Sequence, residues 1–252
     1  MKKYLEEARV IGNEAITEAI YKLTFEAPQI ARSALPGQFV NVSVETAFLR
    51  RPFGIVEACG ETGVVTIIYR LVGTGTAAMT NLCAGDTVSV EGPLGEGTFS
   101  TAAGKVLLVG GGVGTAPMLY YGRTLRATGH TPVFLLGGRS DRDLLQRERF
   151  LEIGQLCCTT EDGSAGEQGF VTQHSVWNAQ QFDLVAACGP VPMMKAVAAL
   201  SRQKGYACRV SLENMMACGI GACLCCVEKT TKGNVCVCTE GPVFDIAELT
   251  WQ

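Results

Sequence analysis

The sequence has few histidines, little excess charge and no long apolar run. Only two histidines occur among 252 residues, so few histidine ligands are available for a zinc site of mixed cysteine and histidine ligands. A net charge of −3 without a basic run offers nothing that would attract nucleic acid. No stretch approaches the roughly 18 apolar residues of a membrane span, and acidic residues follow the first lysines where a signal peptide needs its apolar core. We therefore expect no nucleic-acid partner, no membrane partner and no secretory signal.

Cysteine is abundant, with twelve in the chain. Without a secretory signal, so many cysteines indicate a reducing compartment in which thiols stay free for metal, and we expect a cytoplasmic location. Six of them lie in one stretch near the end of the chain, where Cys218, Cys223 and Cys226 have the C-x4-C-x2-C spacing of plant-type [2Fe–2S] ligation. The fourth ligand is Cys236 or Cys238. These lie two apart on an expected short strand and so point to the same face, and spacing does not choose between them.

The residues between these cysteines are small. Gly219, Gly221 and Ala222 allow the backbone to turn tightly and to direct N–H groups at anionic sulfurs, which tunes a reduction potential. Cys225 does not fit the spacing. A zinc site would pair its ligands as C-x2-C twice or include histidine, and core thiols would not cluster around glycines. We interpret the stretch as an iron–sulfur site; the alternative from another class is a colourless, zinc-binding interaction module.

Two patterns divide the rest of the chain. From residue 6 to about 95, short β-rich segments alternate with turns, which is typical of an antiparallel barrel or sandwich. The expected strands are residues 9–16, 20–27, 37–44, 53–59, 64–72 and 87–92, with a short helix over 75–82. After residue 101, strands alternate with helices, which predicts a parallel sheet with crossover helices. The expected strands are 105–109, 132–138, 155–162, 182–190 and 207–213, and the helices are 115–128, 141–150, 171–177 and 191–203.

A glycine-rich turn follows the first strand of the expected parallel sheet. There, backbone N–H groups at the start of a helix can meet a pyrophosphate. The spacing differs from G-x-G-x-x-G, so a simple tight turn is the competing interpretation. Cys188-Gly189-Pro190 ends a later strand at the same edge, where parallel sheets bind ligands. The predicted nucleotide-binding residues are Gly110, Gly111, Gly112, Gly114, Cys188, Gly189 and Pro190, with Cys188 near the nicotinamide and no residue assigned as catalytic.

The β-rich half offers a third group of candidates. Arg50 and Arg51 precede a Pro-Phe-Gly segment, and Tyr69 and Arg70 precede a glycine- and threonine-rich helix start. Arginines and helix N–H groups suit the phosphates of a flavin, and the face of a tyrosine suits its ring. Arginines on a strand are more often simply solvated, so these residues carry little weight alone.

The order of these motifs resembles the ferredoxin-reductase superfamily, in which a flavin-binding barrel with an R-P-x-S/T segment precedes a nucleotide domain with a glycine-rich loop and C-G-P. With the C-terminal cysteine motif followed by G-P-V-F, the chain looks most like the electron transfer subunits of class 1B dihydroorotate dehydrogenase. The resemblance covers nearly the whole chain. It implies an antiparallel FAD-binding β-barrel over residues 1–100, a parallel-sheet NAD-binding domain over 101–212 and a small [2Fe–2S] domain over 213–252.

The resemblance also implies roles for individual residues. The last ligand of the family shortly precedes G-P-V-F, which favours Cys238 over Cys236 and gives Cys218, Cys223, Cys226 and Cys238 as the metal ligands. Gly54 stands where serine or threonine is common, so only its backbone could contact the flavin. The implied FAD-binding residues are Arg51, Pro52, Phe53, Gly54, Ile68, Tyr69, Arg70, Gly75 and Thr76.

The implied function is electron transfer in pyrimidine biosynthesis. An FMN-containing catalytic subunit, two copies with two of this chain, would oxidise dihydroorotate and pass electrons to the cluster, FAD and NAD. FAD exchanges both hydrides and single electrons, so it can join nicotinamide to an iron–sulfur centre. Arg139-Ser140 could hold the 2′-phosphate of NADP, but the resembling family generally uses NAD, which we expect here. Flavin and iron–sulfur subunits for ferredoxin-linked NADP reduction, sulfide dehydrogenase or hydrogenase share the motifs and are the nearest alternatives.

Overall fold

The computed structural model describes residues 2–45, 47–99 and 104–251. Contacts divide the chain into two compact units. The first contains Met1–Thr98, Asn214–Glu228 and Asn234–Pro242, and the second contains Phe99–Glu213, Lys229–Gly233 and Val243–Gln252. Most of the cysteine-rich stretch thus belongs to the same unit as the N-terminal strands. The three domain ranges expected from the sequence stay a prediction, and the boundary at 100/101 lies outside the described residues.

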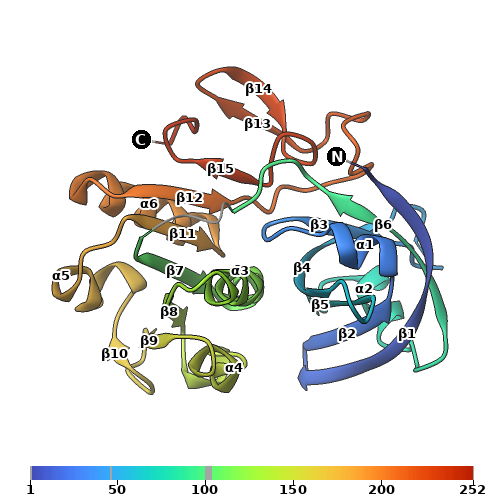
Figure 1. Cartoon of the computed structure of the whole chain (residues 1–252), viewed down its shortest axis with the longest axis horizontal. Coiled ribbons are helices and arrows are strands. Elements are labelled where there is room, and N and C mark those ends of the chain that lie inside the picture. Colours follow the sequence, from blue (N-terminus) through green and yellow to red (C-terminus); the bar gives the residue numbers. More distant parts are fainter. Residues whose placement is uncertain (1, 46, 100–103, 252) are drawn as a thin grey trace. The chain divides into compact units, whose positions relative to one another are not determined.

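The N-terminal strands close into an antiparallel barrel with the order β1-β2-β5-β4-β3-β6 (Figure 1). Leu23, Phe25 and Ile67 are fully buried, since alternate residues of a barrel strand face the interior. The barrel implied by the resemblance is confirmed. Its strands are β1 (Tyr4–Thr17), β2 (Ile20–Glu26), β3 (Phe39–Val42), β4 (Arg51–Cys59), β5 (Val64–Arg70) and β6 (Thr87–Leu94).

Two short helices connect barrel strands. One is α2 (Thr74–Met79), close to the range expected for it. The other, α1 (Pro28–Ser33), lies between two expected strands, where the sequence predicted only a turn. Proline suits the first helical turn, where its missing N–H is not needed. The carboxylate of Glu6 on β1 accepts hydrogen bonds from Gln29 N and Ile30 N at 3.2 and 2.9 Å, a cap that local sequence cannot reveal.

The second unit is built on a sheet with the order β10-β9-β8-β7-β11-β12-β15 (Figure 1). The five parallel strands expected from the sequence are confirmed. All six residues of β7 are buried, as a central parallel strand covered on both faces requires. The parallel strands are β7 (Val106–Gly111), β8 (Val133–Gly138), β9 (Gln155–Thr160), β11 (Leu184–Cys188) and β12 (Ala207–Ser211), with the short β10 (Glu167–Gln168) at one edge and the antiparallel β15 (Val243–Asp245) at the other.

The expected crossover helices are present, two of them in shorter pieces. The longest, α6 (Val191–Lys204), ends at Gly205, whose φ of 74° allows the left-handed turn that closes a helix. The expected helix over 141–150 is interrupted at Gln146, which has a φ of 55°. The remaining helices are η1 (Gly112–Gly114), α3 (Thr115–Ala127), η2 (Asp141–Asp143), α4 (Arg147–Leu151), η3 (Val171–Gln173) and α5 (Val176–Ala179).

The cysteine-rich stretch has little regular structure. Its only strands in the described chain form the hairpin of β13 (Val227–Thr230) and β14 (Gly233–Cys236). Cys236 ends β14 and Cys238 lies in the turn beyond it, so the expectation that both share one strand is wrong. The structure therefore gives these two cysteines different surroundings.

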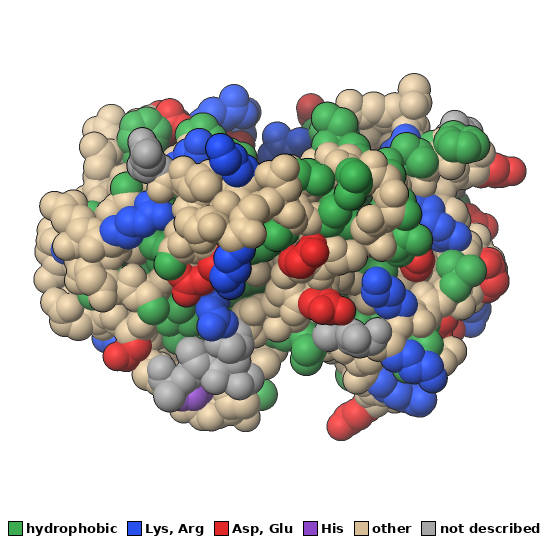
Figure 2. Space-filling model, turned by 90° about the horizontal axis from the view of Figure 1, so that it is seen from above, with side chains coloured by type: hydrophobic (Ala, Val, Ile, Leu, Met, Phe, Trp, Pro, Cys, Tyr) green, Lys and Arg blue, Asp and Glu red, His purple; other side chains and the backbone are tan. Residues whose placement is uncertain are grey.

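Membrane-spanning length and surface charge can both be examined in the described part of the chain. No helix in the described ranges is long and apolar enough to cross a membrane. On the face shown in Figure 2, basic and acidic side chains are interspersed rather than gathered in a patch of one sign.

Candidate functional site

The loop that begins at Cys218 directs backbone N–H groups at cysteine sulfurs. Cys218 Sγ accepts hydrogen bonds from Ala222 N at 3.3 Å and from Ile220 N at 3.5 Å. Gly221 N, which lies between these two donors, points to a different sulfur, Cys238 Sγ, at 3.2 Å. The loop therefore donates hydrogen bonds to the first and the last cysteine of the motif.

The other two predicted ligands also accept backbone N–H groups. Cys226 Sγ accepts from Cys238 N at 3.4 Å, and Cys223 Sγ accepts from Cys225 N at 3.5 Å. Each of the four predicted ligands thus has at least one amide donor. Such donors stabilise a thiolate and tune the potential of a cluster that it binds.

The two remaining cysteines of the stretch differ from these four. Cys225 Sγ lies against a backbone acceptor, the carbonyl oxygen of Met215, at 3.6 Å. Cys236 Sγ contacts the thiol of Cys226 but receives no backbone N–H from the part of the chain that the structure describes. Hydrogen bonding from backbone N–H groups therefore distinguishes Cys238 from Cys236, which the cysteine spacing does not.

The four thiols meet in pairs. Cys218 contacts Cys223, and Cys226 contacts Cys238 as well as Cys236. Although burial acts to raise it, hydrogen bonds from Ile220 N and from Cys223 lower the pKa of Cys218 to about 6. In the described ranges, no three histidine, cysteine, aspartate or glutamate side chains are grouped to hold a single metal ion. Two pairs of thiols are what two irons, each with two protein ligands, would need.

Unusual backbone conformations shape this loop. Gly219 and Gly221 have φ values of 72° and 85°, as their small size led us to expect. Leu224 also has a positive φ, 57°, which the sequence did not indicate. A left-handed conformation is costly for a residue other than glycine, so the surrounding loop must hold Leu224 in place.

In the barrel unit, Arg51 and the start of α2 lie together. A Cβ added at Gly75 would lie 2.8 Å from Arg51 Nε, so a larger residue there would push the guanidinium aside. Arg51 Nη1 also donates to Leu49 O at 2.6 Å. The adjacent Arg50 is engaged elsewhere, with hydrogen bonds to the carbonyl and hydroxyl oxygens of Ser89 at 2.8 and 3.0 Å. Arg51 and α2 thus form the cation and helix start predicted for flavin phosphates.

Two predicted flavin residues have side chains occupied within the protein. Tyr69 is only 1% exposed, its ring is stacked on Tyr21 at 5.5 Å, and its hydroxyl donates to Asn13 Oδ1 at 3.1 Å. Burial raises the pKa of Tyr69. The hydroxyl of Thr76 accepts from Gly73 N at 3.2 Å and donates back to Gly73 O. The ring face expected from Tyr69 is therefore not free, and both residues can offer a ligand only their backbone.

The other predicted residues of the barrel lie on the same strands or beside them. Phe53 and Gly54 follow Pro52 on β4, where Gly54 pairs with Phe39 of β3. Ile68 is buried on β5, and Arg70 at the end of that strand is exposed. The sequence-predicted residues of this group thus lie on β4, β5 and α2.

The glycine turn and the Cys-Gly-Pro segment are in direct backbone contact. Gly110 pairs with Cys188 across the parallel strands β7 and β11. A Cβ at Gly114 would lie 2.6 Å from Gly189 Cα, so any larger residue would push the two turns apart. All the nucleotide-binding residues predicted from the sequence lie at this edge of the sheet: Gly110, Gly111, Gly112, Gly114, Cys188, Gly189 and Pro190.

Cys188 has a carboxylate partner that the sequence did not reveal. The thiol is 1% exposed and donates to Glu213 Oε1 at 3.8 Å. Burial, followed by the charge of Glu213, raises the pKa of Cys188 well above its ordinary value. Burial also raises the pKa of Glu213, although part of that residue is exposed to solvent. The sequence does place Glu213 just after β12, at the edge where parallel sheets bind ligands, and this position could have indicated a role for it.

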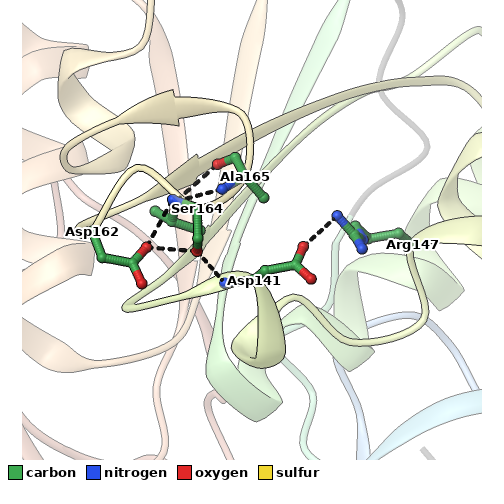
Figure 3. Close-up of polar contacts among 6 residues, drawn as sticks. Asp141, Arg147, Asp162, Ser164 and Ala165 are labelled. Carbon is green, nitrogen blue, oxygen red and sulfur yellow. Dashed lines mark hydrogen bonds and ion pairs between the residues drawn. The ribbon is translucent and has the colours of Figure 1, made fainter.

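The loops after β8 and β9 are joined by a polar network (Figure 3). Asp141 N donates to Ser164 Oγ at 2.8 Å, and Ser164 Oγ donates to Asp162 Oδ1 at 2.6 Å. The Asp141 carboxylate also pairs with Arg147 Nη1 at 2.7 Å. These contacts fix the loop that carries Arg139-Ser140.

In that loop, one carboxylate, that of Asp143, contacts both Arg139 and Ser140. Asp143 Oδ2 accepts hydrogen bonds from Arg139 N at 3.0 Å and from Ser140 N at 3.2 Å, and it lies 3.7 Å from Arg139 Nε. Amides that could have met a phosphate are thus held by a carboxylate.

Two family descriptions and many relatives match the chain. Residues 108–199 match the oxidoreductase NAD-binding domain, and residues 213–250 match the iron–sulfur cluster binding domain of dihydroorotate dehydrogenase B. The dihydroorotate dehydrogenase B (NAD(+)) electron transfer subunit of Shouchella clausii is 36% identical to this chain, and the match covers 99% of both chains. That of Fusobacterium nucleatum is 38% identical over 95% of this chain and 96% of the relative. The chain belongs to the family of dihydroorotate dehydrogenase B electron transfer subunits.

Solved structures share this fold. A structure of an NADH-dependent reduced ferredoxin-NADP oxidoreductase, described for flavin-based electron bifurcation, is 31% identical with a TM-score of 0.89, over 98% of this chain and 90% of that chain. A ferredoxin reductase in carbazole 1,9a-dioxygenase has a TM-score of 0.70 at 21% identity, over 82% of this chain and 67% of that chain, which shows the shared fold alone.

Family membership confirms the resemblance inferred from the order of motifs. The chain is an oxidoreductase subunit for electron transfer, with an NAD-binding domain and an iron–sulfur domain. The fold expected from the sequence is confirmed as well. The individual ligands, the type of cluster and the contacts of the flavin stay predictions.

Proposed function

We propose that the chain carries electrons between NAD and the dihydroorotate-oxidising subunit of a dihydroorotate dehydrogenase B, through FAD and a [2Fe–2S] cluster. The observation that carries the proposal is the loop in which four sulfurs each accept a backbone N–H group. Their grouping as two pairs fits a cluster of two irons. The proposed ligands are Cys218, Cys223, Cys226 and Cys238.

The residues of each unit have separate tasks in this proposal. FAD, when bound, exchanges a hydride with nicotinamide and single electrons with an iron–sulfur cluster. Arg51 and the first turn of α2 bind its phosphates, with Gly75 leaving room for the close approach. The turn at Gly110–Gly114 presents its backbone to the pyrophosphate of NAD. Cys188 and Glu213, at the same edge of the sheet, form the polar end of that site.

We further propose NAD rather than NADP as the nicotinamide. Three acids, Asp141, Asp143 and Asp162, lie on the loops after β8 and β9. A 2′-phosphate there would face carboxylates, whereas a ribose hydroxyl can donate to one of them. In this proposal, the adenosine end of the nucleotide binds beside these loops.

The partner side of the proposal rests on the surface of the cysteine loop. Met215, Ile220 and Leu224 are 82%, 45% and 66% exposed, and Cys223 between them is exposed too. Apolar side chains exposed beside a redox centre suit a docked subunit. We propose that an FMN-containing catalytic subunit docks here, with two copies of each chain in the complex, and that the complex is cytoplasmic, where twelve free thiols stay reduced.

Purification of the chain with its natural partner tests the proposal. We expect FAD and two irons on this chain, FMN on the partner, and NAD-dependent orotate formation by the complex. The isolated chain should oxidise NADH with artificial acceptors and leave dihydroorotate untouched. A colourless protein, or orotate formation by the chain alone, would contradict the proposal.

A second candidate is a subunit that links NADH or NADPH to ferredoxin. It is favoured by the likeness to the ferredoxin-NADP oxidoreductase structure, which extends over 98% of this chain. The two candidates differ in their partners, since the second predicts a large subunit with several clusters in place of an FMN-containing subunit. Copurification therefore distinguishes them.

A further inference from the structure

Strand β3 of the barrel is buried along its whole length. Phe39, Val40, Asn41 and Val42 are each less than 5% exposed. A barrel strand normally leaves alternate side chains facing outward, so something covers the outer face of β3. Asn41, 1% exposed, is a polar residue in this position and needs hydrogen-bond partners.

The partners of Asn41 lie in the cysteine loop and on the next strand. Its side-chain Nδ2 donates to the carbonyl oxygen of Cys218 at 3.3 Å. The same nitrogen lies 3.5 Å from Glu91 Oε2, and Glu91 pairs with Asn41 across strands β3 and β6. An amide nitrogen carries two hydrogens, so the carboxylate can orient the group while the other hydrogen holds the carbonyl.

The contact also explains the glycine after Cys218. A Cβ at Gly219 would lie 2.1 Å from Asn41 Nδ2, and the φ of 72° at this position already disfavours other residues. The backbone of the loop therefore lies directly against the amide of Asn41. Asn41 of the barrel therefore fixes the position of the Cys218 carbonyl and of the turn at Gly219.

The far end of the motif is attached to the barrel as well, through the segment that follows β6. Glu96 N donates to Thr239 O at 2.8 Å, and Gly97 N donates to Gly241 O at 2.9 Å. These bonds immediately follow Cys238. The barrel thus holds both arms of the motif, one by backbone pairing and the other by a single side chain.

We propose that Asn41 is a positioning residue for the iron–sulfur site. By holding the Cys218 carbonyl, it fixes the turn in which Ile220 N and Ala222 N point at the Cys218 sulfur. It touches no sulfur itself and acts through the backbone. The inference rests on the proposed function, because it needs a cluster at these cysteines.

The test uses the full chain with its copurified partner and the variant Asn41→Leu, which keeps the branched shape of the side chain and removes the amide. Thr66→Val is the matched control, since Thr66 is a buried barrel residue whose hydroxyl pairs with Thr24 at 3.3 Å, away from β3. We expect Asn41→Leu to lose its cluster absorbance to a chelator about tenfold faster, the scale of substitutions that orient a metal ligand, and to shift the reduction potential. Thr66→Val should change neither, and bound flavin should be unchanged in both.

Unchanged chelation rate and unchanged potential in Asn41→Leu would overturn the inference. If that variant does not fold, a second comparison decides. Asn41→Ala, which removes the amide without adding bulk, should also lose its cluster to the chelator faster than the wild-type chain and at a shifted reduction potential; wild-type values for both would overturn the inference. A wild-type chain without any cluster would instead refute the proposed function.

Discussion

Gly221 N donates a hydrogen bond to Cys238 Sγ at 3.2 Å and so joins the first turn of the cysteine motif to its last member. Gly221 adopts a φ of 85°, which opens the turn toward that sulfur, and Cys238 is fully buried. Cys236 receives no comparable donor from the described chain. The relationship favours Cys238 as the fourth ligand independently of the family resemblance.

The first prediction follows from this contrast. Cys238→Ser should lose the cluster, because it removes a sulfur that the loop is built to hold. Cys236→Ser should keep it, with an unchanged visible spectrum. Iron content and electron paramagnetic resonance of the two dithionite-reduced variants check this, and the reverse result would make Cys236 the ligand.

Much of the fold could be predicted, because apolar strands and glycine turns carry local patterns. The six barrel strands and five parallel strands lie close to the expected ranges. Helix α1 could not be predicted, since Glu6, distant in the sequence, caps it. A proline that reads as a break is here the first residue of a helix.

The functional site, like the fold, could be predicted only in part. Cysteine spacing is a local property of the sequence. It therefore predicted all four cysteines whose sulfurs accept hydrogen bonds from backbone N–H groups. Glu213 beside Cys188 and Asn41 beside Cys218 depend on which strands are neighbours in space, so sequence order concealed them. The ring of Tyr69 was expected to face a flavin, but the sequence could not show that Tyr21 stacks on it.

The second prediction concerns two adjacent arginines. Arg51→Gln should weaken FAD binding about tenfold or more, since a hydrogen bond to a charged group contributes roughly 1.5–3 kcal/mol. Arg50→Gln should leave the flavin in place, because Arg50 is engaged with Ser89. Fluorescence titration of FAD into flavin-free protein measures both affinities. Equal losses in the two variants would contradict the assignment of Arg51.

The third prediction concerns the choice of nicotinamide. The wild-type chain should have a higher kcat/KM for NADH than for NADPH. Asp143→Asn should raise kcat/KM for NADPH about fivefold, since a carboxylate and a phosphate a few ångströms apart in water repel by about 1 kcal/mol. Asp183→Asn is the control, because Asp183 precedes β11 at the opposite edge of the sheet and accepts a hydrogen bond from Lys105 N at 2.7 Å. A wild-type preference for NADPH would refute the charge argument.

The fourth prediction is a loss of stability in mild acid that originates at His174. Its Nδ1 accepts a hydrogen bond from Val176 N at 2.9 Å, and its Nε2 lies 3.4 Å from Glu167 Oε1. Burial lowers the pKa of His174, against an opposing effect of Glu167. Below pH of about 6.5, the unfolded chain therefore binds a proton that the folded chain resists, and the free energy of unfolding should fall as the pH falls.

The two tryptophans make this effect measurable. Trp177 is 2% exposed, and its indole N–H donates to Val171 O at 2.7 Å, so its emission reports local unfolding in a Trp251→Phe background. Denaturant unfolding at pH values between 5 and 8 should give a free energy that declines toward acid. His174→Asn should flatten this decline, because asparagine can still accept the helix N–H but does not titrate. His130→Asn, the control at the other histidine, should leave the slope intact, and an unchanged slope in His174→Asn would place the acid sensitivity elsewhere.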